Sequence, residues 1–295
     1  MRRAREPEPP VRHELMHRAS TAAWWRPFAA GALDLLLPAA CALCHRPHRP
    51  DEADGIVCGV CLTQLVPFAY PQCERCGHPR SASAYPSLAG QGPSEVPAPA
   101  ACGWCARLHP ALRAVRSVAR MDTGTATDLV HALKYRGWSR VAVPMGRRMA
   151  RVHWPLDVSS ERRALVPMPL GRVRQRERGY NQATELAQVL AGAWHLPVWA
   201  DALVRTRETR SQVRLTPSER SGNVSRAFAV PMHRRASLRG QHVVLVDDVI
   251  TTAATVNAAV QALWEGGARI ISCVTFGRAP DPGDRAASDS DFTRN

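Results

Sequence analysis

Lysine is almost absent from this 295-residue chain, because Lys134 is the only lysine among its 39 basic side chains. Arginine therefore carries nearly all of the positive charge, and a guanidinium differs from an ammonium in shape and hydration. A lysine kept in such a sequence indicates a position that needs a compact cation, although chance retention gives the same pattern. We single out Lys134 as a candidate functional residue.

Acidic residues are too few to balance the basic ones, and the formal net charge is +14. Residues 1–110 hold 11 basic and 9 acidic side chains, whereas residues 111–295 hold 28 basic and 16 acidic ones. A basic surface attracts phosphate groups, either on a small substrate or on nucleic acid. A solvated arginine-rich face has the same composition, so charge alone does not decide between these interpretations.

Long apolar runs are missing, and no segment approaches the roughly 20 apolar residues that span a bilayer. The run from Phe28 to Cys41 could resemble an exported or lipid-modified N-terminus, but Asp34 interrupts it. Cys41 also belongs to a cysteine set with another use. We therefore predict a cytoplasmic protein with no transmembrane segment.

Eight of the nine cysteines form four Cys-x-x-Cys pairs: Cys41 and Cys44, Cys58 and Cys61, Cys73 and Cys76, Cys102 and Cys105. This spacing lets two thiolates bind one metal from a tight turn, and two such pairs complete a tetrahedral Zn²⁺ site. Eight cysteines fit two structural zinc sites, with sequential pairing the simplest and a cross-braced pairing left open. Disulfides and redox thiols are the alternatives, but repeated pairs in a cytosolic-looking chain favour zinc.

From residue 111 onward the hydrophobic pattern is that of an α/β domain. We expect Arg172 to Gln182 to form a basic loop suited to phosphate groups, and Gly137 to end a helix. Cys273 is expected to be an inert thiol inside a strand. The predicted elements are strands at 112–121, 164–170, 242–247 and 269–276, and helices at 125–136, 138–151, 182–194 and 253–265.

The stretch from Val243 to Thr255 carries the strongest functional signal. Four branched apolar residues predict a strand buried on both faces, followed by Asp247 and Asp248, a run of small and hydroxyl residues, and a helix. Loop N–H groups and a helix N-terminus in this order face an anion. An ordinary buried strand with acidic residues at its end is the plainer interpretation.

This stretch resembles the signature of the type I phosphoribosyltransferases, which bind phosphoribosyl pyrophosphate (PRPP). The resemblance implies that Asp247 and Asp248 hold the ribose hydroxyls. It implies that the 5′-phosphate is cradled by Thr251, Thr252, Ala253, Ala254 and Thr255. By the same analogy the pyrophosphate loop contains Pro167, Met168 and Pro169, Mg²⁺ accompanies PRPP, and Lys134 and Arg178 contact the diphosphate.

Two positions depart from that family. Ala253 stands where a glycine is usual, so a positive φ at this position would be strained. Thr251 stands where base-salvage members often have a general base, and a threonine hydroxyl is a poor base. The second departure argues against an ordinary purine-salvage enzyme.

The chain as a whole resembles the ComF family of late competence proteins over roughly residues 35–277. The marks are the cysteine pairs, Leu133 to Tyr135 before a glycine, Val166 to Pro169, the run from Arg178 to Gln182, and the acidic-pair stretch. Further marks are Thr209 with Gln212 and Arg220 with Asn223. The resemblance implies a type I phosphoribosyltransferase-like, mostly parallel sheet preceded by a double zinc-ribbon module.

We expect four segments: a disordered or short helical N-terminus (1–34), the zinc module (35–110), the phosphoribosyltransferase-like domain (111–278) and a disordered tail (279–295). The resemblance implies a PRPP-binding protein of DNA uptake and natural transformation, with single-stranded DNA and an uptake helicase or other competence proteins as partners. The implied activity is pentosyl transfer to an acceptor that the sequence does not identify. The alternatives are a non-catalytic single-stranded-DNA-binding or adaptor protein, and a nucleobase phosphoribosyltransferase of nucleotide salvage.

Overall fold

The computed structural model describes residues 40–48, 56–80, 102–121, 124–206 and 227–280. These residues all belong to one compact unit, Ala40–Asn295. The predictions for residues 1–34 and 281–295, and the marks at residues 209–223, lie outside the described residues. Within the described ranges no helix is long and apolar enough to cross a membrane.

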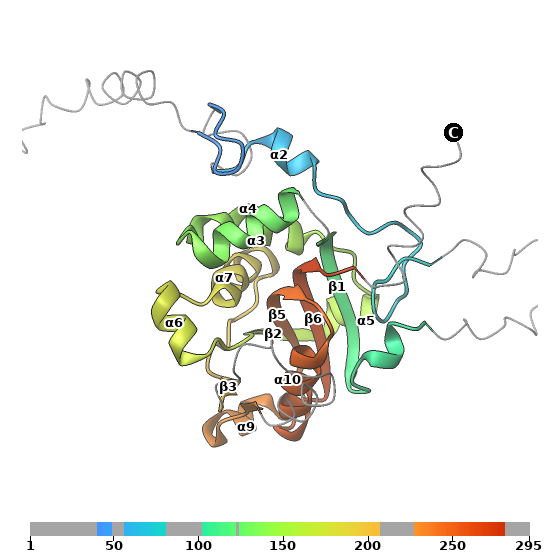
Figure 1. The fold of residues 1–295 in the computed structure, drawn as a ribbon. Coiled ribbons are helices and arrows are strands. Elements are labelled where there is room, and N and C mark those ends of the chain that lie inside the picture. Colours follow the sequence, from blue (N-terminus) through green and yellow to red (C-terminus); the bar gives the residue numbers. More distant parts are fainter. Residues whose placement is uncertain (1–39, 49–55, 81–101, 122–123, 207–226, 281–295) are drawn as a thin grey trace, which may run out of the picture. The chain divides into compact units, whose positions relative to one another are not determined.

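Four parallel strands form the central sheet, in the order β1-β6-β5-β2 (Figure 1). Their bounds are Leu112–Arg120 for β1, Arg162–Pro167 for β2, His242–Ile250 for β5 and Ile270–Arg278 for β6. Strand β5 is central because Leu245 pairs with Val166 on one side and Cys273 on the other. The predicted mostly parallel α/β fold is confirmed. Cys273 is buried as predicted, and this burial raises the pKa of its thiol.

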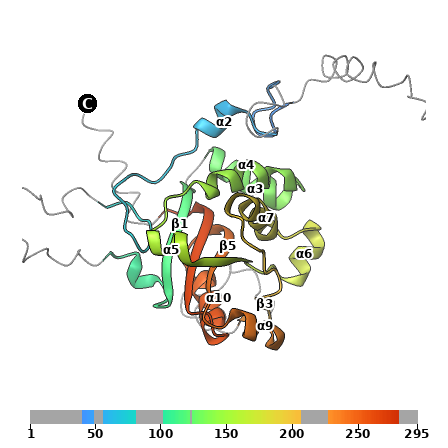
Figure 2. The same ribbon diagram turned by 180° about the vertical axis from the view of Figure 1, so that it is seen from behind.

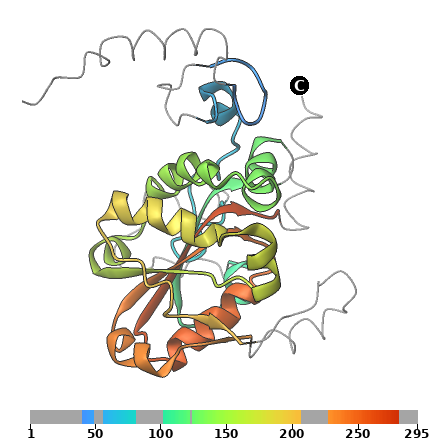
Figure 3. The same cartoon turned by 90° about the vertical axis from the view of Figure 1, so that its left-hand side faces the viewer.

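Alternate residues of β5 pack into different hydrophobic clusters, as expected for a strand covered on both faces. Val243 and Leu245 belong to the cluster that contains α10 (Ala254–Glu265). Val244 and Val246 belong to the cluster that contains Leu129, Met145 and Leu186, from three helices that precede β5. Figure 3 shows the consequence, with green and yellow helices on one side of the sheet and the orange helix α10 on the other.

The remaining helices are α2 (Gly59–Thr63), α3 (Thr125–Tyr135), α4 (Ala142–Ala150), α5 (Leu156–Glu161), α6 (Arg172–Arg178), α7 (Gln182–Trp194) and α9 (Met232–Leu238). Short 3₁₀ turns lie at Cys105–Arg107 and Ser139–Val141, and Val204–Arg205 (β3) pairs antiparallel with Phe228–Ala229 (β4). Gly137, with φ of 68°, follows α3 as the predicted stop. Figure 2 shows α5 beside β1, where Arg113 Nε lies 2.7 Å from Asp157 Oδ2.

Two local predictions were wrong. The basic loop expected at 172–182 is largely a helix, α6, because its arginine, glutamine and glutamate residues are good helix formers. Gly179, with φ of 77°, ends that helix. Strand β5 also continues to Ile250 instead of ending at residue 247, since it pairs with β6 as far as Arg278. The acidic pair therefore lies inside the strand and is held by its hydrogen bonding.

Candidate functional site

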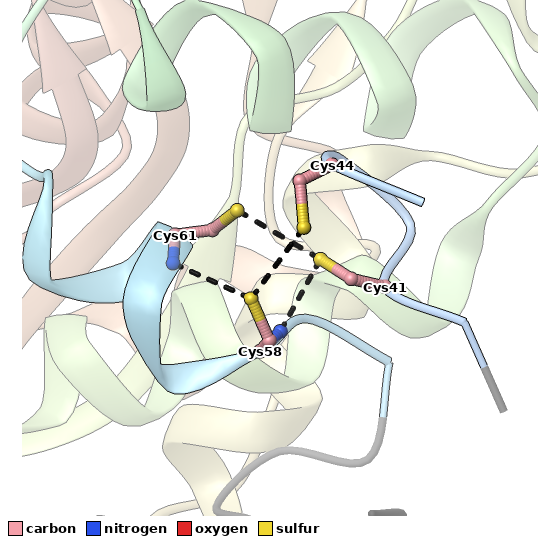
Figure 4. A group of neighbouring side chains, drawn as sticks. All are labelled: Cys41, Cys44, Cys58 and Cys61. Carbon is pink, nitrogen blue, oxygen red and sulfur yellow. Dashed lines mark hydrogen bonds between the residues drawn. The ribbon is translucent and has the colours of Figure 1, made fainter. Parts of the chain in front are cut away.

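The first cysteine cluster consists of Cys41, Cys44, Cys58 and Cys61. Figure 4 shows the four sulfur atoms pointing toward one another, between the turn at Cys41 and the start of α2. The sulfurs of Cys41 and Cys61 are 3.8 Å apart, and those of Cys44 and Cys58 are 3.7 Å apart. A zinc–sulfur distance of about 2.3 Å in a tetrahedron requires sulfurs about 3.8 Å apart, so the geometry fits Zn²⁺.

Backbone N–H groups support this cluster from outside. Leu43 N and Cys58 N donate to Cys41 Sγ over 3.4 and 3.3 Å. Burial alone would raise the pKa of Cys41, but hydrogen bonds from the backbone of Cys58, Cys44 and Leu43 outweigh it and lower the pKa to about 6. One ligand is therefore readily ionised at neutral pH, which favours metal binding.

The second cysteine cluster consists of Cys73, Cys76, Cys102 and Cys105. Its closest sulfur pairs are 3.5 Å (Cys73 and Cys105) and 3.4 Å (Cys76 and Cys102). The sequential pairing predicted from the sequence is confirmed, and the cross-braced alternative is wrong. With four thiolate ligands and no open position, both clusters fit structural zinc sites.

The second cluster is attached to the α/β sheet and to α10. The Arg75 guanidinium donates to the carbonyls of Leu112 and His109, and Val115 N donates to the Arg75 carbonyl. On the other side, Asn257 of α10 accepts from His109 N over 2.9 Å and donates to the Arg107 carbonyl over 2.7 Å. The second cluster is thus joined by hydrogen bonds to α10, the helix that follows the acidic-pair strand.

Arg278, at the end of β6, lies beside the second cluster and is only 1% exposed. Its Nη2 donates to the Cys76 carbonyl over 2.5 Å, and its Cζ lies 5.2 Å from the Phe68 ring and 4.7 Å from the Trp104 ring. Its Nε and Nη1 have no hydrogen-bond partner among the residues that the structure describes. Burial lowers the pKa of Arg278, whereas the nearby Cys76 and Cys273 thiol groups raise it.

A cleft of about 540 Å³ lies at the carboxyl ends of β2 and β5. Eight of the residues predicted from the sequence line it: Lys134, Met168, Pro169, Arg178, Asp247, Asp248, Thr251 and Thr255. Pro167, Thr252, Ala253 and Ala254 are not among its lining residues. Ligand sites of open α/β sheets lie at this edge, where the strand ends diverge. The two halves of the prediction, far apart in sequence, thus meet at one cavity.

The acidic pair and the single lysine are in direct contact. Lys134 Nζ lies 3.0 Å from Asp248 Oδ2, and Asp248 N donates to Asp247 Oδ1 over 2.9 Å. Asp247 is 9% exposed and Asp248 is 3% exposed. Burial raises the pKa of Asp247 and the charge of Asp248 raises it further, while Lys134 opposes both. A second cation at this pair would therefore be favourable.

The loop after β5 ends at Ala253, the N-cap residue of α10, which has φ of 63° and ψ of −6°. An alanine in this left-handed conformation is strained, as the sequence predicted for any positive φ. Ala253 is buried and has no side chain that could cap the helix. The first turn of α10 therefore lacks a side-chain cap from Ala253, and Thr251 and Thr255 at this end of the helix line the cleft. A helix N-terminus at a cleft is suited to an anion.

Several cleft residues were not predicted individually: Tyr135, Gly137, Leu170, Arg174, Glu177, Gln182, Arg205 and Val249. The Arg178 Cζ lies 5.3 Å from the Tyr135 ring, so the end of α3 and the end of α6 meet here. The Tyr180 hydroxyl donates to the Leu133 carbonyl, which fixes the backbone of α3 at the residue before Lys134. Gln182 had a sequence signal, because it closes the run from Arg178; Arg205 had none beyond its charge.

Comparisons with known proteins agree with this architecture. A family model described as a double zinc ribbon domain matches residues 32–106, and one described as a phosphoribosyl transferase domain matches residues 176–293. A "DNA utilization protein YhgH" of Salmonella typhimurium is 31% identical over 244 residues, covering 80% of this chain and 96% of that protein. The chain belongs to the ComF family.

Other relatives of the ComF family match over different lengths. The "Competence protein ComFC" of Bacillus subtilis is 28% identical over 222 residues, covering 74% of this chain and 81% of that protein. The "Competence protein F" of Haemophilus influenzae is 34% identical over 116 residues, covering 39% of this chain and 50% of that protein. The ComF combination of a double zinc ribbon with a phosphoribosyltransferase domain is thus present here.

Proposed function

We propose that this ComF protein binds PRPP together with Mg²⁺ in the cleft and acts in the use of incoming DNA in the cytoplasm. One observation carries the proposal: a single cavity is lined by Lys134, Arg178, Asp247, Asp248 and Thr251. The names of the relatives support the DNA role. We also propose the predicted division into a zinc module at 35–110 and a transferase-like domain at 111–278.

Each part of the cleft has a proposed task. Asp247 and Asp248 accept hydrogen bonds from the ribose hydroxyls, and the start of α10 with Thr251 to Thr255 holds the 5′-phosphate. The turn at 167–169, Lys134 and Arg178 hold the diphosphate. Asp247 and Asp248 would hold Mg²⁺, because carboxylate oxygens are preferred ligands of this ion, and Mg²⁺ would supply positive charge to the site.

If an acceptor attacks C1 of the ribose, the C1–oxygen bond breaks and pyrophosphate leaves with the electron pair. Lys134 and Arg178 would stabilise the charge that develops on the leaving group. Thr251 cannot deprotonate an acceptor efficiently, so the acceptor must be nucleophilic by itself or be activated by another group. This is why nucleobase salvage is the weaker alternative.

Isothermal titration with PRPP and Mg²⁺ tests the binding proposal. We expect heat of binding with the wild-type chain and none with Asp247→Asn/Asp248→Asn, because the ribose and cation ligands are weakened together. Asp157→Asn, which removes a carboxylate from the remote ion pair with Arg113, is the control and should bind as the wild type does. Absence of heat with the wild-type protein, or heat unchanged in the double variant, would refute PRPP binding.

A non-catalytic role on single-stranded DNA is the second candidate. Tyr135 is 67% exposed at the cleft edge beside Arg178, and Arg136 Cζ lies 5.4 Å from the Trp138 ring. An exposed tyrosine ring next to arginine, with the half-buried Trp138 nearby, suits base stacking and phosphate contact. Affinity for an oligonucleotide should fall steeply with salt and should fall in Tyr135→Ala. A PRPP-consumption screen against candidate acceptors, with and without DNA, separates the two candidates.

A further inference from the structure

Another cavity, the amino-edge cavity, lies at the amino-terminal ends of β2 and β5, whose carboxyl ends form the cleft. Its volume is about 320 Å³, and its lining includes Ser160, Glu161, Arg163, Gln241, His242 and Arg269. None of these six residues lines the cleft. His242 begins β5, and Asp247 follows five residues later. At about 3.3 Å per residue, this places the cavity about 16 Å along the strand from the acidic pair.

Backbone hydrogen bonds fix the side of the amino-edge cavity that precedes β5. The Gln241 carbonyl accepts from Arg269 N over 2.9 Å, which joins the turn before β5 to the turn before β6. Gly240 also lines the cavity, and a Cβ built there would have no heavy atom within 4 Å, so open space lies beside this turn. The next residue, His242, is 1% exposed, and its Nε2 lies 3.0 Å from Ser272 Oγ. The cavity is therefore bordered by a fixed backbone.

The side chains of the cavity leave one positive charge uncompensated. Arg269 Nη2 donates to Glu161 Oε2 over 2.5 Å, so these two charges offset each other. Arg163 is exposed, and across the described residues its guanidinium makes no hydrogen bond, ion pair or ring contact. The amide group of the half-buried Gln241 has no partner in those residues either. A guanidinium and an amide together offer several N–H donors from different directions.

These groups suit a phosphate monoester better than a simple ion. A guanidinium binds phosphate oxygens in bidentate fashion, and a tetrahedral phosphate has a further oxygen for the Gln241 amide. A planar carboxylate would satisfy Arg163 alone. The volume of the cavity falls at the lower end of the roughly 300–1,000 Å³ of small-molecule sites, so it can hold an organic group attached to the phosphate. Glu161 Oε1 can accept from a hydroxyl or amino group of that part.

We propose that the amino-edge cavity binds a small phosphate monoester, with Arg163 and Gln241 on the phosphate and Glu161 on a hydroxyl or amino group of the ligand. This site is separate from the cleft, and it does not depend on PRPP binding there. A ligand in it joins the starts of β2 and β5. The phosphodiester groups of DNA offer related chemistry, and the test below distinguishes them from a monoester.

Titrations of the full-length, ¹⁵N-labelled chain test this site by following the backbone amide signals of Ser160, Gly240 and Gln241. The probes are AMP, ribose 5-phosphate, adenosine, acetate and a single-stranded oligonucleotide without terminal phosphates, all at one ionic strength. We expect saturable shifts with the two monoesters, and at least tenfold weaker binding of adenosine and acetate. Arg163→Gln should weaken both monoesters about tenfold at these signals, and Gln241→Leu about threefold. Arg235→Gln makes the same charge change on the exposed surface of α9, outside both cavities, and should change neither affinity.

Several outcomes would overturn the proposal. They are monoester shifts confined to cleft signals such as that of Thr251, unchanged affinity in Arg163→Gln, equal weakening in Arg235→Gln, and acetate binding as tight as that of the monoesters. Arg163-dependent binding of the oligonucleotide that is tighter than that of AMP would assign the cavity to DNA instead. The Asp247→Asn/Asp248→Asn variant should keep the monoester shifts at the cavity, so this proposal and PRPP binding fail independently. The dispersion of the amide signals shows that each variant is folded, and Arg163→Gln alters only an exposed side chain.

Discussion

Zinc bound at the second cysteine cluster should stabilise a buried arginine that has no acidic partner. Four thiolates and one Zn²⁺ carry a net charge of −2, and the Arg278 guanidinium packs beside Cys76 in the cluster. In the described ranges no salt bridge joins Arg278 to a carboxylate. The positive charge therefore depends on the zinc-bound cluster for compensation, and it offsets half of the cluster's net charge of −2.

Removing one partner of a buried ion pair costs about 3–5 kcal/mol, which sets the size of the coupling between Arg278 and the zinc-bound cluster. The lower end applies because Cys102 and Cys105 are only half-buried and solvent screens part of the interaction. A coupling of about 3 kcal/mol corresponds to roughly a hundredfold in zinc affinity. We thus expect Arg278→Met to lower the zinc affinity of the second cluster by roughly a hundredfold and to leave the affinity of the first cluster unchanged.

Competition with a chromogenic chelator measures both dissociation constants in the folded protein. Arg162→Met is the control for loss of an arginine over an aromatic ring, because the partly buried Arg162 stacks 4.0 Å from the Trp194 ring, away from the cysteines. The reasoning is refuted if both ions keep their affinity within threefold in Arg278→Met, or if Arg162→Met weakens zinc equally. It is also refuted if the affinity lost by Arg278→Met is shared by both ions.

Two further predictions concern stability. Ala253→Gly should raise the free energy of unfolding by about 1 kcal/mol, measured by urea denaturation, because glycine relieves the left-handed φ; no gain would mean that the loop is unstrained. Burial lowers the pKa of His242 from 6.5 to about 4, so the unfolded chain takes up a proton first as the pH falls. Its contribution is present above pH 6.5 and lost toward pH 4, and between pH 6.5 and 5 the wild type should lose about 1.6 kcal/mol more than His242→Gln. Equal losses in both proteins would contradict this assignment.

The parts of the site that could be predicted from the sequence are those whose chemistry is local. Cys41 and Cys44 lie in one four-cysteine cluster because a tight turn brings them together, and the same spacing recurs in the other pairs. The acidic pair was recognised because a buried strand, two carboxylates and a helix follow one another directly. In both cases the residues that act together lie within a few positions of each other.

The parts that could not be predicted depend on contacts between distant segments. Arg278 reaches the Cys76 carbonyl across 202 positions, and no local pattern marks it as buried. Arg205 and Gln182 reach the cleft because β3 and α7 start there, which depends on the packing of the whole sheet. Helix α6 differs from the predicted loop because the high charge of this segment favours exposure to solvent, which a helix allows as well as a loop does. Arginine, glutamine and glutamate are all strong helix formers.

Lys134 illustrates how a compositional hint acquires a physical explanation. It lies in the last turn of α3, where Tyr180 fixes the backbone by donating to the Leu133 carbonyl, and its ammonium contacts Asp248. The pair of buried carboxylates raises the pKa of Asp247 and needs a nearby positive charge even before any ligand binds. A planar guanidinium is larger than an ammonium and would fill part of the cleft in which we propose that a diphosphate binds. The same small cation can thus neutralise the acidic pair in the free protein and turn to the ligand in the complex, which gives a reason for a lysine in a chain that otherwise uses arginine.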